Sequence, residues 1–510
     1  MTALAWEVHM PAGVRAEDLD LTAKANLPSA WVRVWASTPS APTLFDRDRG
    51  WIHAEQLEEA TRRMAGRLQG AGLEPGDRML FSAASSLELV IAHVAALRAG
   101  IVVVPANTAY REREVAHVVT DARPKAALVD DPDRARWILA AAGSETVVVG
   151  PDVDLPDGEP AALDAMAPDE PALIGYTSGT TGSPKGAVLT HANLLAGSES
   201  VGLAWRWTAR DRLVLALPLF HVHGLCVGLH GTLLAGASTV LLPRFDVDSV
   251  LDAASSHDAS LFFGVPTMYH RLAQSSRVGE LARLRLCVSG SAPLPAELHR
   301  ALAERGGQEV LERYGMTETL MNVSNPYDGE RRAGTVGFPL PGVQLRLSNG
   351  QEGEIQLRGP NIFAGYWERP EATAESFTDG WFRTGDLGSV DSDGYLRILG
   401  RSNELIISGG FNVYPREVED VLLAHPGVSE VAVVGTPSDE WGEIVTAFVV
   451  PAGDEPRPDV LIAFAAEQLA AFKRPRLLHF VESLPRNALG KVVKHELAVN
   501  HVRSRTVSPR

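Results

Sequence analysis

The chain has 510 residues, of which 45% are hydrophobic and 22% charged, and this composition is typical of a globular protein. A net charge of −16 at pH 7 argues against a general nucleic-acid or anionic-membrane binder, so an anionic substrate would need a local cluster of Lys and Arg. The length exceeds what one hydrophobic core usually supports, and we expect two or more domains.

The first part of the chain alternates between helix and strand patterns. A helix is predicted within residues 53–77, where one stripe carries Leu57, Thr61, Met64 and Leu68. A strand pattern follows at residues 78–84, then a second helix at 86–100 and a continuous apolar strand at 101–107. The alternation continues to about residue 300, which is typical of wound α/β layers.

The pattern changes at Gly342 to short alternating segments with Gly and Asp turns, which favour antiparallel β structure. Apolar periodicity stops for several residues after "ILGR", at Arg401–Asn403, and a further α/β segment follows. We therefore predict an α/β fold. Residues 1–402 would form a large N-terminal domain of wound α/β subdomains plus a β-rich subdomain, and residues 403–510 a small C-terminal α+β domain.

The two cysteines, and the lack of a recognisable signal peptide or membrane span in the sequence, favour an intracellular protein. Cys226 and Cys287 lie in apolar runs, which favours buried free thiols over a metal site or a disulfide framework. The N-terminal stretch lacks a basic region followed by an apolar core, so we expect no signal peptide. The longest apolar tract, Leu213–Leu242, is interrupted by Pro218, by histidines and by glycines, which argues against a membrane span. A cytoplasmic location is expected.

The stretch "YTSGTTGSPKG", Tyr176–Gly186, is rich in Gly and hydroxyl residues and follows an apolar strand pattern. Backbone N–H groups of such a loop can converge on a phosphate, and Lys185 adds a positive charge. The alternative is a mobile surface turn, which Gly, Ser and Pro also favour. The stretch is not a Walker loop, because Lys185 follows Pro184 and precedes Gly186.

Further motifs follow along the chain: "RYGMTET" at Arg313–Thr319, "WFRTGDLG" at Trp381–Gly388, "ILGRSNELIISGGFNVYPREVE" at Ile398–Glu419 and "LPRNALGKVVK" at Leu484–Lys494. In this order and at these distances, the set resembles the adenylate-forming acyl-CoA synthetase superfamily, which also holds luciferases and nonribosomal-peptide adenylation domains. The resemblance covers nearly the whole chain beyond the N-terminal lead. It implies an acid–thiol ligase that uses ATP, Mg²⁺ and coenzyme A and passes through an acyl-AMP.

The resemblance also implies where ATP binds. The phosphates would be held by Thr177, Ser178, Gly179, Thr180, Thr181, Gly182 and Lys185. Tyr314 would stack on the adenine, with the following residues Gly315, Met316 and Thr317 beside the nucleotide. Asp386 and Arg401 would reach the ribose hydroxyls.

The implied catalytic residues are Lys491, Glu318, His221 and Thr177. Glu318 would bind Mg²⁺ together with Thr181, which suits a hard cation shared with phosphate oxygens. Lys491 would approach the reacting carboxylate and the α-phosphate as negative charge builds there.

In this family the C-terminal domain rotates between the two half-reactions, and Asn403 occupies the matching hinge position, where many relatives carry Asp or Lys. Asn tolerates left-handed conformations, so the hinge is expected to work. Residues implied to meet coenzyme A are Ser408, Gly409, Gly410, Lys473 and Arg474.

The acyl pocket implied by the resemblance draws on His221, Val222, Met268, Arg271, Arg285, Ser289 and Met316. Strand periodicity places Arg285 on the face of Ser289, and Arg271 lies three residues after Met268 on one side of a helix. A guanidinium at the base of a pocket is costly unless it is paired, and a second carboxylate on the substrate would pair with it in bidentate fashion. For each arginine the alternative is an outward side chain paired with a surface acid.

With "HVHG", "GVPTMYHR" and the stretch around "GMTETLM", the chain looks like malonyl-CoA and methylmalonyl-CoA synthetases. Val222 and Met316 would then limit the α-substituent. One alternative is a fatty-acyl or aryl-CoA ligase with structural arginines; another is a carrier-protein-loading adenylation domain or a non-catalytic relative. The expected partners are a small carboxylic acid, ATP and coenzyme A, without nucleic acid or membrane, for a monomer or homodimer.

Overall fold

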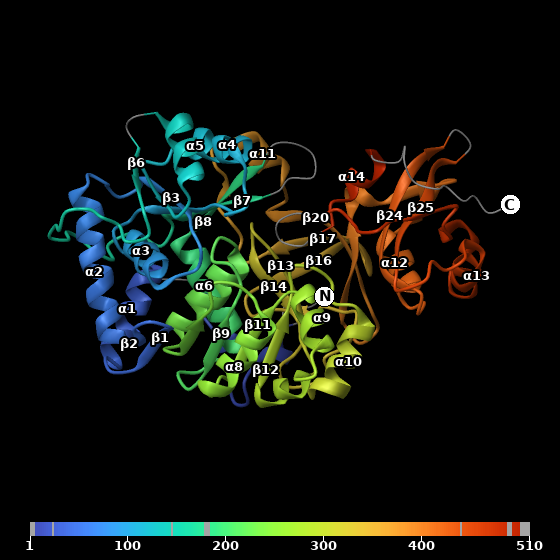
Figure 1. Ribbon diagram of the computed structural model, residues 1–510, viewed down its shortest axis with the longest axis horizontal. Helices are drawn as coiled ribbons and strands as arrows, with labels where there is room; N and C mark the ends of the chain where they lie inside the picture. Colours follow the sequence, from blue (N-terminus) through green and yellow to red (C-terminus); the bar gives the residue numbers. More distant parts are fainter. Residues whose placement is uncertain are drawn as a thin grey trace. The chain divides into compact units, whose positions relative to one another are not determined.

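The alternation of strands and helices predicted for the first part of the chain is present in a computed structural model, and the α/β fold class is confirmed (Figure 1). The structure describes residues 6–22, 25–143, 146–177, 184–438, 441–486 and 492–499. The chain forms two compact units, one of residues 1–345 and 357–382 and the other of residues 346–356 and 383–510. The boundary between residues 402 and 403 stays a prediction.

The first sheet of the larger unit has the order β18-β8-β7-β4-β3-β5-β6. Its strands are β3 (Arg78–Ser82), β4 (Val102–Pro105), β5 (Ala126–Val129), β6 (Val147–Val149), β7 (Pro171–Thr177), β8 (Lys185–Thr190) and β18 (Gly365–Tyr366). β3 pairs in parallel with β4 and β5, and β4 pairs in parallel with β7, whereas β8 is antiparallel to both β7 and β18. The continuous apolar runs of the parallel strands are buried, as predicted.

The helices near this sheet are α1 (Leu27–Ser37), α2 (Ala54–Gly70), α3 (Leu87–Arg98), α4 (Glu112–Ala122), α5 (Pro132–Ala142) and α11 (Pro370–Glu375). The predicted stripe of α2 faces inward: Leu57, Thr61 and Leu68 are fully buried, and Met64 is 8% exposed. Valines of α4 and Ile138 of α5 join one apolar cluster with the strands they cover.

The second sheet has the order β15-β14-β13-β12-β11-β9-β10-β1-β2. Its strands are β1 (Pro42–Asp46), β2 (Gly50–His53), β9 (Arg212–Leu215), β10 (Ser238–Leu241), β11 (Leu261–Gly264), β12 (Leu286–Ser289), β13 (Leu311–Met316), β14 (Leu320–Ser324) and β15 (Phe338–Pro339). The run from β13 to β1 is parallel. Parallel strands bring their carboxyl ends to one edge, where ligands bind in open α/β sheets.

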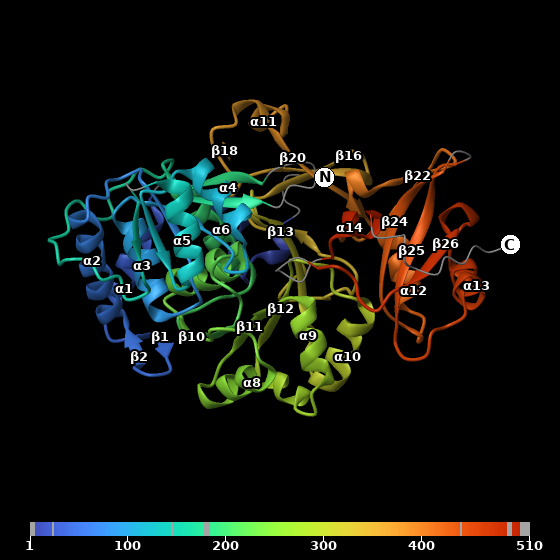
Figure 2. The same cartoon turned by 45° about the horizontal axis from the view of Figure 1, so that its top comes forward.

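Helices α8 (Val247–Ser256), α9 (Pro266–Gln274) and α10 (Ala296–Gly306) pack beside β11 and β12 (Figure 2). Helices α6 (His191–Ala204) and α7 (His230–Leu234) belong to the same unit, and α7 continues a π-helix, η3 (His223–Leu229). Cys287 lies in the core shared by α8, α9 and α10, and Cys226 lies in η3. Both cysteines are buried free thiols, as predicted.

The antiparallel strands predicted from Gly342 onward are present, and most of their residues belong to the smaller unit. They are β16 (Gln344–Asn349), β17 (Glu352–Arg358), β20 (Trp381–Val390) and β21 (Leu396–Arg401), while β19 (Phe377–Thr378) forms a hairpin with the start of β20. A second sheet has the order β23-β22-β25-β24, with β26 beside β25.

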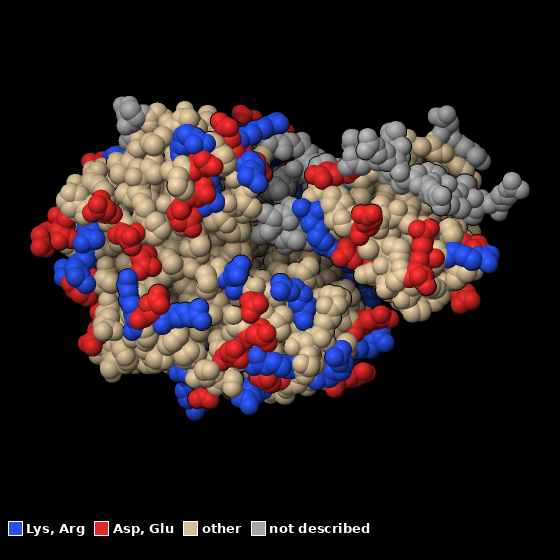
Figure 3. All heavy atoms as spheres, viewed as in Figure 1, with Lys and Arg blue, Asp and Glu red and all other residues tan. Residues whose placement is uncertain are grey.

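The strands of that second sheet are β22 (Ile406–Ser408), β23 (Phe411–Val413), β24 (Val428–Ser438), β25 (Gly442–Pro451) and β26 (Leu477–Phe480). Helices α12 (Pro415–Leu423) and α13 (Pro458–Gln468) pack on it through one apolar cluster, and α14 (Lys494–Val499) follows near the end of the chain. On the face seen in Figure 3, Lys and Arg are interspersed with Asp and Glu.

Candidate active site

The Gly-rich stretch is held at both ends by a β-hairpin. Thr177 ends β7 and Lys185 begins β8, and the two residues are register partners. The hydroxyl of Thr177 donates to the carbonyl oxygen of Lys185 over 3.4 Å. Ser178, Gly179, Thr180, Thr181 and Gly182 lie outside the described residues, so the predicted phosphate contacts of this loop stay predictions.

Tyr366 connects two residues that the sequence placed around ATP. Its hydroxyl donates a hydrogen bond to Oε1 of Glu318 over 3.0 Å, and Nζ of Lys185 lies 5.1 Å from the centre of its ring. Tyr366 is brought there by β18, which pairs with β8 so that Tyr366 faces Ala187 in register. Sequence reasoning missed this tyrosine, because a two-residue strand has no periodicity that could reveal it.

The loop after β13 is positioned by close backbone approach. A Cβ on Gly315 would lie 2.0 Å from the carbonyl oxygen of Leu320, and the β13–β14 ladder carries a bulge between Tyr314 and Gly315. A Cβ on Gly175 of β7 would lie 2.5 Å from the methyl group of Thr317. Because Gly315 and Gly175 have no side chains, the "GMTET" loop can pack closely against β7, the strand that leads into the Gly-rich stretch.

Met316 and Tyr314, both predicted to lie beside the nucleotide, are neighbours. The hydroxyl of Tyr314 lies 3.9 Å from the sulfur of Met316, and both side chains are partly exposed. Glu318 in the same loop is 6% exposed, which places a carboxylate in a largely dehydrated position.

In the smaller unit, Asp386 and Arg401 face each other across β20 and β21. Nε of Arg401 lies 2.8 Å from Oδ1 of Asp386, and Nη1 donates to the carbonyl oxygen of Thr384 over 3.3 Å. The backbone N–H of Asp386 donates to the hydroxyl of Thr384 over 3.0 Å. The two predicted ribose residues are thus brought together and held in one orientation.

The "SGG" turn of the smaller unit connects β22 to β23. Ser408 is buried, and Gly409 and Gly410 have positive φ angles of 57° and 81°. A Cβ on Gly409 would lie 2.7 Å from the ring of Trp441. A side chain at Gly409 is thus excluded both by its conformation and by the indole.

The other residues predicted for coenzyme A and for catalysis have defined surroundings in this unit. Nζ of Lys473 donates to both oxygens of Glu417 over 2.7 Å, and Arg474 donates to the carbonyl oxygens of Leu469 and Ala466. Asn403 is exposed in the turn η5 (Ser402–Glu404). Lys491 lies outside the described residues.

His223 begins η3 and His221 lies two residues before it, and a π-helix is often found at functional sites. His221 is uncharged at neutral pH, because burial and the nearby Arg313 lower its pKa to about 4. Burial, then Arg313 and His221, hold the pKa of His223 well below its ordinary range. His223 stacks on Phe263 with 6.5 Å between ring centres, and its Nδ1 lies 3.4 Å from the hydroxyl of Ser291.

Arg285 does not have the unpaired charge on which its predicted role depended. Its Nε and Nη2 donate to the two carboxylate oxygens of Asp211 over 2.6 and 2.7 Å, and its other donors reach the carbonyl oxygens of Trp205 and Arg206. It precedes β12, whereas Ser289 ends that strand, so the two residues lie at opposite ends of it. The prediction of a shared pocket used strand parity and ignored this separation.

None of the predicted pocket residues Met268, Arg271 and Val222 is fully buried. Met268 is half-buried and packs against the core of α8, α9 and α10. Arg271 is exposed, with its guanidinium 5.1 Å from the ring centre of Phe245, so its charge is hydrated rather than buried. Val222 is half-buried next to His223.

Arg313 is the buried arginine of this region, and the sequence analysis assigned it no role. It is 4% exposed, and a Cβ on Gly290 would lie 2.3 Å from its Cζ. Burial lowers the pKa of this guanidinium to about 9, so it is still charged at neutral pH. Among the residues that the structure describes, its Nε and Nη2 have no hydrogen-bond partner. Its place in "ERYGMTET" was the signal available in the sequence.

Residues 31–367 match the family model of the AMP-binding enzymes, and residues 417–491 match that of the AMP-binding enzyme C-terminal domain. The chain belongs to the AMP-binding enzyme family. This AMP-binding enzyme is 38% identical over 481 residues to a feruloyl-CoA synthase of Amycolatopsis sp, a match covering 91% of this chain and 97% of that protein. It is 37% identical over 478 residues to a malonate–CoA ligase of Arabidopsis thaliana, covering 84% of this chain and 79% of the relative.

Among solved structures, ATP-bound MatB from Rhodopseudomonas palustris is similar, with a TM-score of 0.88 at 41% identity over 94% of this chain and 99% of that chain. The resemblance to the adenylate-forming superfamily is thereby confirmed. The family and these relatives identify the chain as an acyl-CoA ligase. The two relatives are named for different acids, so the comparisons do not identify the acid that this chain uses.

The described part of this AMP-binding enzyme contains no group of three His, Cys, Asp or Glu residues that could hold a metal ion. Mg²⁺ does not require such a group, because it usually takes one or two carboxylates together with substrate phosphates. The buried Glu318 fits that requirement. Within the described ranges, no helix is long and apolar enough to cross a membrane.

Proposed function

We propose that this acyl-CoA ligase acts on malonate or methylmalonate. The observation that carries the proposal is the polarity of the predicted acyl-binding region. Ser289, His223 and Arg313 are all buried there, whereas a fatty-acid tunnel calls for apolar walls. The similarity to a malonate–CoA ligase over most of the chain supports the same acid.

For the first half-reaction, we propose that a carboxylate oxygen of the acid attacks the α-phosphorus of ATP. The bond between the α-phosphorus and its bridging oxygen breaks, and pyrophosphate leaves. Lys491 would stabilise the charge that builds on the α-phosphate, and the Gly-rich stretch with Lys185 would hold the departing phosphates. His221, neutral at this pH, would stand beside the reacting carboxylate.

Bound Mg²⁺ would neutralise charge on the phosphates. Glu318 would hold it, together with Thr181, in the position that Tyr366 fixes by its hydrogen bond. Tyr314 would stack on the adenine, and Asp386 would accept hydrogen bonds from the ribose while Arg401 holds its carboxylate in place.

For the second half-reaction, the thiolate of coenzyme A would attack the carbonyl carbon of the acyl-AMP, the bond between this carbon and the bridging oxygen of the mixed anhydride would break, and AMP would leave with that oxygen. Coenzyme A would be bound by the "SGG" turn, Lys473 and Arg474 after the C-terminal domain has rotated about Asn403. Lys473 would then exchange Glu417 for a phosphate of coenzyme A.

An aryl acid is the second candidate, because the feruloyl-CoA synthase aligns over nearly its whole length. A panel of acids decides between the two. Malonate, methylmalonate, succinate, butyrate, octanoate, benzoate and ferulate would be compared by pyrophosphate release with ATP, Mg²⁺ and coenzyme A. Our proposal requires malonate or methylmalonate to give the highest kcat/KM; a preference for ferulate or octanoate would overturn it.

A further inference from the structure

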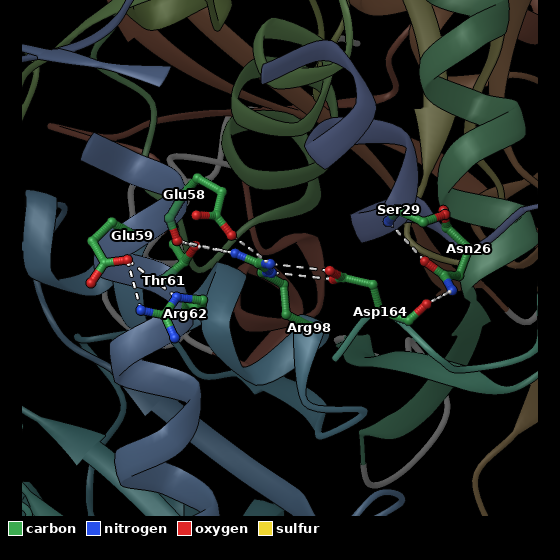
Figure 4. A network of polar contacts seen from close by, with 8 residues as sticks. All are labelled: Asn26, Ser29, Glu58, Glu59, Thr61, Arg62, Arg98 and Asp164. Atoms are coloured by element: carbon green, nitrogen blue, oxygen red, sulfur yellow. Dashed lines mark hydrogen bonds and ion pairs between the residues drawn. The ribbon is translucent and has the colours of Figure 1, made fainter. Parts of the chain in front are cut away.

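Some side chains of the larger unit hold a connecting segment by donating to its backbone carbonyl oxygens. Figure 4 shows one case, in which Asn26 points to the segment that contains Asp164. Nδ2 of Asn26 donates to the carbonyl oxygens of Asp164 and Met166, each over 2.8 Å. Such a contact orients the peptide plane to which the carbonyl group belongs.

His117 of α4 makes the same kind of contact beside the Gly-rich stretch. Its Nε2 lies 2.8 Å from the carbonyl oxygen of Pro184. A carbonyl oxygen only accepts, so Nε2 carries a proton and donates it to this hydrogen bond. Because the peptide between Pro184 and Lys185 is planar, the hydrogen bond also fixes the backbone nitrogen of Lys185, the predicted phosphate lysine.

The same histidine contacts the opposite strand of the β7–β8 hairpin. Its ring meets that of Tyr176 edge-on, with 6.1 Å between ring centres and an angle of 83° between ring planes. Tyr176 is in register with Gly186, the residue after Lys185. His117 therefore contacts residues on both sides of the hairpin, next to the two ends of the Gly-rich stretch.

Asp121, four residues after His117 on the same side of α4, adds a second attachment. The hydroxyl of Tyr176 donates to Oδ2 of Asp121 over 2.8 Å, and Nη2 of Arg369 donates to Oδ1. Burial and the hydrogen bond to Asp121 raise the pKa of Tyr176, so its hydroxyl keeps the proton that it donates. The hairpin is thus attached to α4 through both His117 and Asp121.

Helix α4 is itself held firmly. Val115, Val118 and Val119 are buried in the apolar cluster that α4 shares with the strands of the first sheet, and Tyr176 packs against this cluster. A side chain on a helix packed in this way positions its target more precisely than a side chain on a loop does.

We propose that His117 is a positioning residue for Lys185, whose backbone it holds so that the ammonium group meets the phosphates of ATP. The inference rests on the proposed function, in which Lys185 holds the departing phosphates. His117 acts through Lys185 and not on ATP directly. The far end of the lysine side chain is held separately, since Nζ lies against the ring of Tyr366.

The test compares His117→Phe, which keeps an aromatic ring beside Tyr176 and removes the donor, with His117→Gln, which restores an N–H donor. Pyrophosphate release by the full-length enzyme is measured with Mg²⁺, varied ATP and the acid that gives the highest kcat/KM in the panel of acids. We expect kcat/KM for MgATP to fall about tenfold to 100-fold in His117→Phe, because a small displacement of a positioned group has an effect of this size. His117→Gln should recover most of the loss.

Two comparisons separate positioning from a general effect on the fold. Transfer from preformed acyl-AMP to coenzyme A involves no β- or γ-phosphate, so His117→Phe should leave it unchanged. His53→Phe is the matched control, because Nδ1 of His53 lies 2.7 Å from the carbonyl oxygen of Ser40 at the start of α2. This control makes the same change at another contact between a histidine and a carbonyl group, and kcat/KM for MgATP should stay at the wild-type value.

A double-mutant cycle with Lys185→Met tests whether His117 acts through the lysine. If it does, adding His117→Phe to Lys185→Met should lower kcat/KM for MgATP little further. Losses that multiply in the double variant would overturn the inference, as would equal losses in both half-reactions or a wild-type kcat/KM in His117→Phe. If Lys185→Met alone leaves ATP use unchanged, or if the wild type releases no pyrophosphate with any acid, the proposed function fails instead.

Discussion

The hydroxyl of Tyr366 donates to Oε1 of Glu318 over 3.0 Å, while Lys185 lies against the same ring. One aromatic side chain thus links the predicted Mg²⁺ ligand to the predicted phosphate lysine, although the three residues are far apart in the sequence. The arrangement suggests that Tyr366 positions Glu318 and does not itself take part in the reaction.

Tyr366→Phe should therefore weaken the response to Mg²⁺ and leave the enzyme active. We expect kcat/KM for MgATP to fall about threefold to tenfold, or about 0.7–1.4 kcal/mol, which is the typical net contribution of one hydrogen bond. Glu318→Gln should lower kcat/KM for MgATP at least about 100-fold, since it removes the charge of the predicted Mg²⁺ ligand. Tyr110→Phe, at another half-buried tyrosine, serves as the control. Equal activity of Tyr366→Phe and the wild type across a Mg²⁺ titration would rule out the positioning role.

Removing the Arg285–Asp211 ion pair should affect stability and not specificity. Asp211 is 5% exposed and also accepts hydrogen bonds from Ser260 and Thr208, so Arg285→Met leaves a buried carboxylate short of two donors. We expect the free energy of unfolding to fall by about 2–3 kcal/mol. Urea unfolding measures this change. A shift in acid preference with unchanged stability would contradict the structural assignment of Arg285.

Buried histidines should make the larger unit sensitive to acid. Nε2 of His93 and Nε2 of His230 lie 2.8 Å apart, and burial lowers the pKa of His93 to about 3. The unfolded chain binds a proton at each histidine near its ordinary pKa of about 6.5, whereas the folded chain does not. Stability is thus fully present above pH 6.5 and is lost as the pH falls from about 6.5 towards 3.

The expected loss for one such histidine between pH 7.5 and pH 5.5 is about 1.4 kcal/mol. His93→Gln should therefore show a shallower fall of unfolding free energy over this interval in urea titrations. His270→Gln, the same change at an exposed histidine, should behave like the wild type. If His93→Gln follows the wild-type pH dependence, the histidine is not buried in its neutral form.

Lys491→Ala tests the division of labour between the two half-reactions. We expect the formation of acyl-AMP from ATP to fall at least about 1,000-fold, because a charge placed against the developing transition state is lost. Transfer from preformed acyl-AMP to coenzyme A should remain nearly intact. Lys125→Ala is the control, at a lysine paired with Asp77 on the surface. Loss of both half-reactions together would argue against domain alternation.

Much of the fold could be predicted because its signals are local. Continuous apolar runs identified buried parallel strands such as β4, and the periodicity of Leu57, Thr61 and Leu68 identified the buried face of α2. The motifs predicted to surround ATP are contiguous in sequence, so their residue types could be recognised without the structure.

The surroundings of the residues predicted to bind the acyl group could not be predicted in the same way, because they depend on contacts between separate segments. Strand parity could not show that Arg285 precedes β12 and pairs with Asp211. Nor could it show that Gly290 leaves room for Arg313, which lies on a different strand. The environment of a charged side chain comes from the elements packed around it, and single-sequence patterns do not contain that information.

Turnover with malonate is the most direct test of whether this enzyme is a malonate-specific acyl-CoA ligase. Purified enzyme would be given ATP, Mg²⁺, coenzyme A and either malonate or butyrate, and AMP and acyl-CoA would be quantified in the same reaction. We expect one AMP for each malonyl-CoA formed, with kcat/KM for malonate at least about 100-fold above that for butyrate. Equal or better use of butyrate, or no conversion of ATP to AMP with malonate, would contradict it.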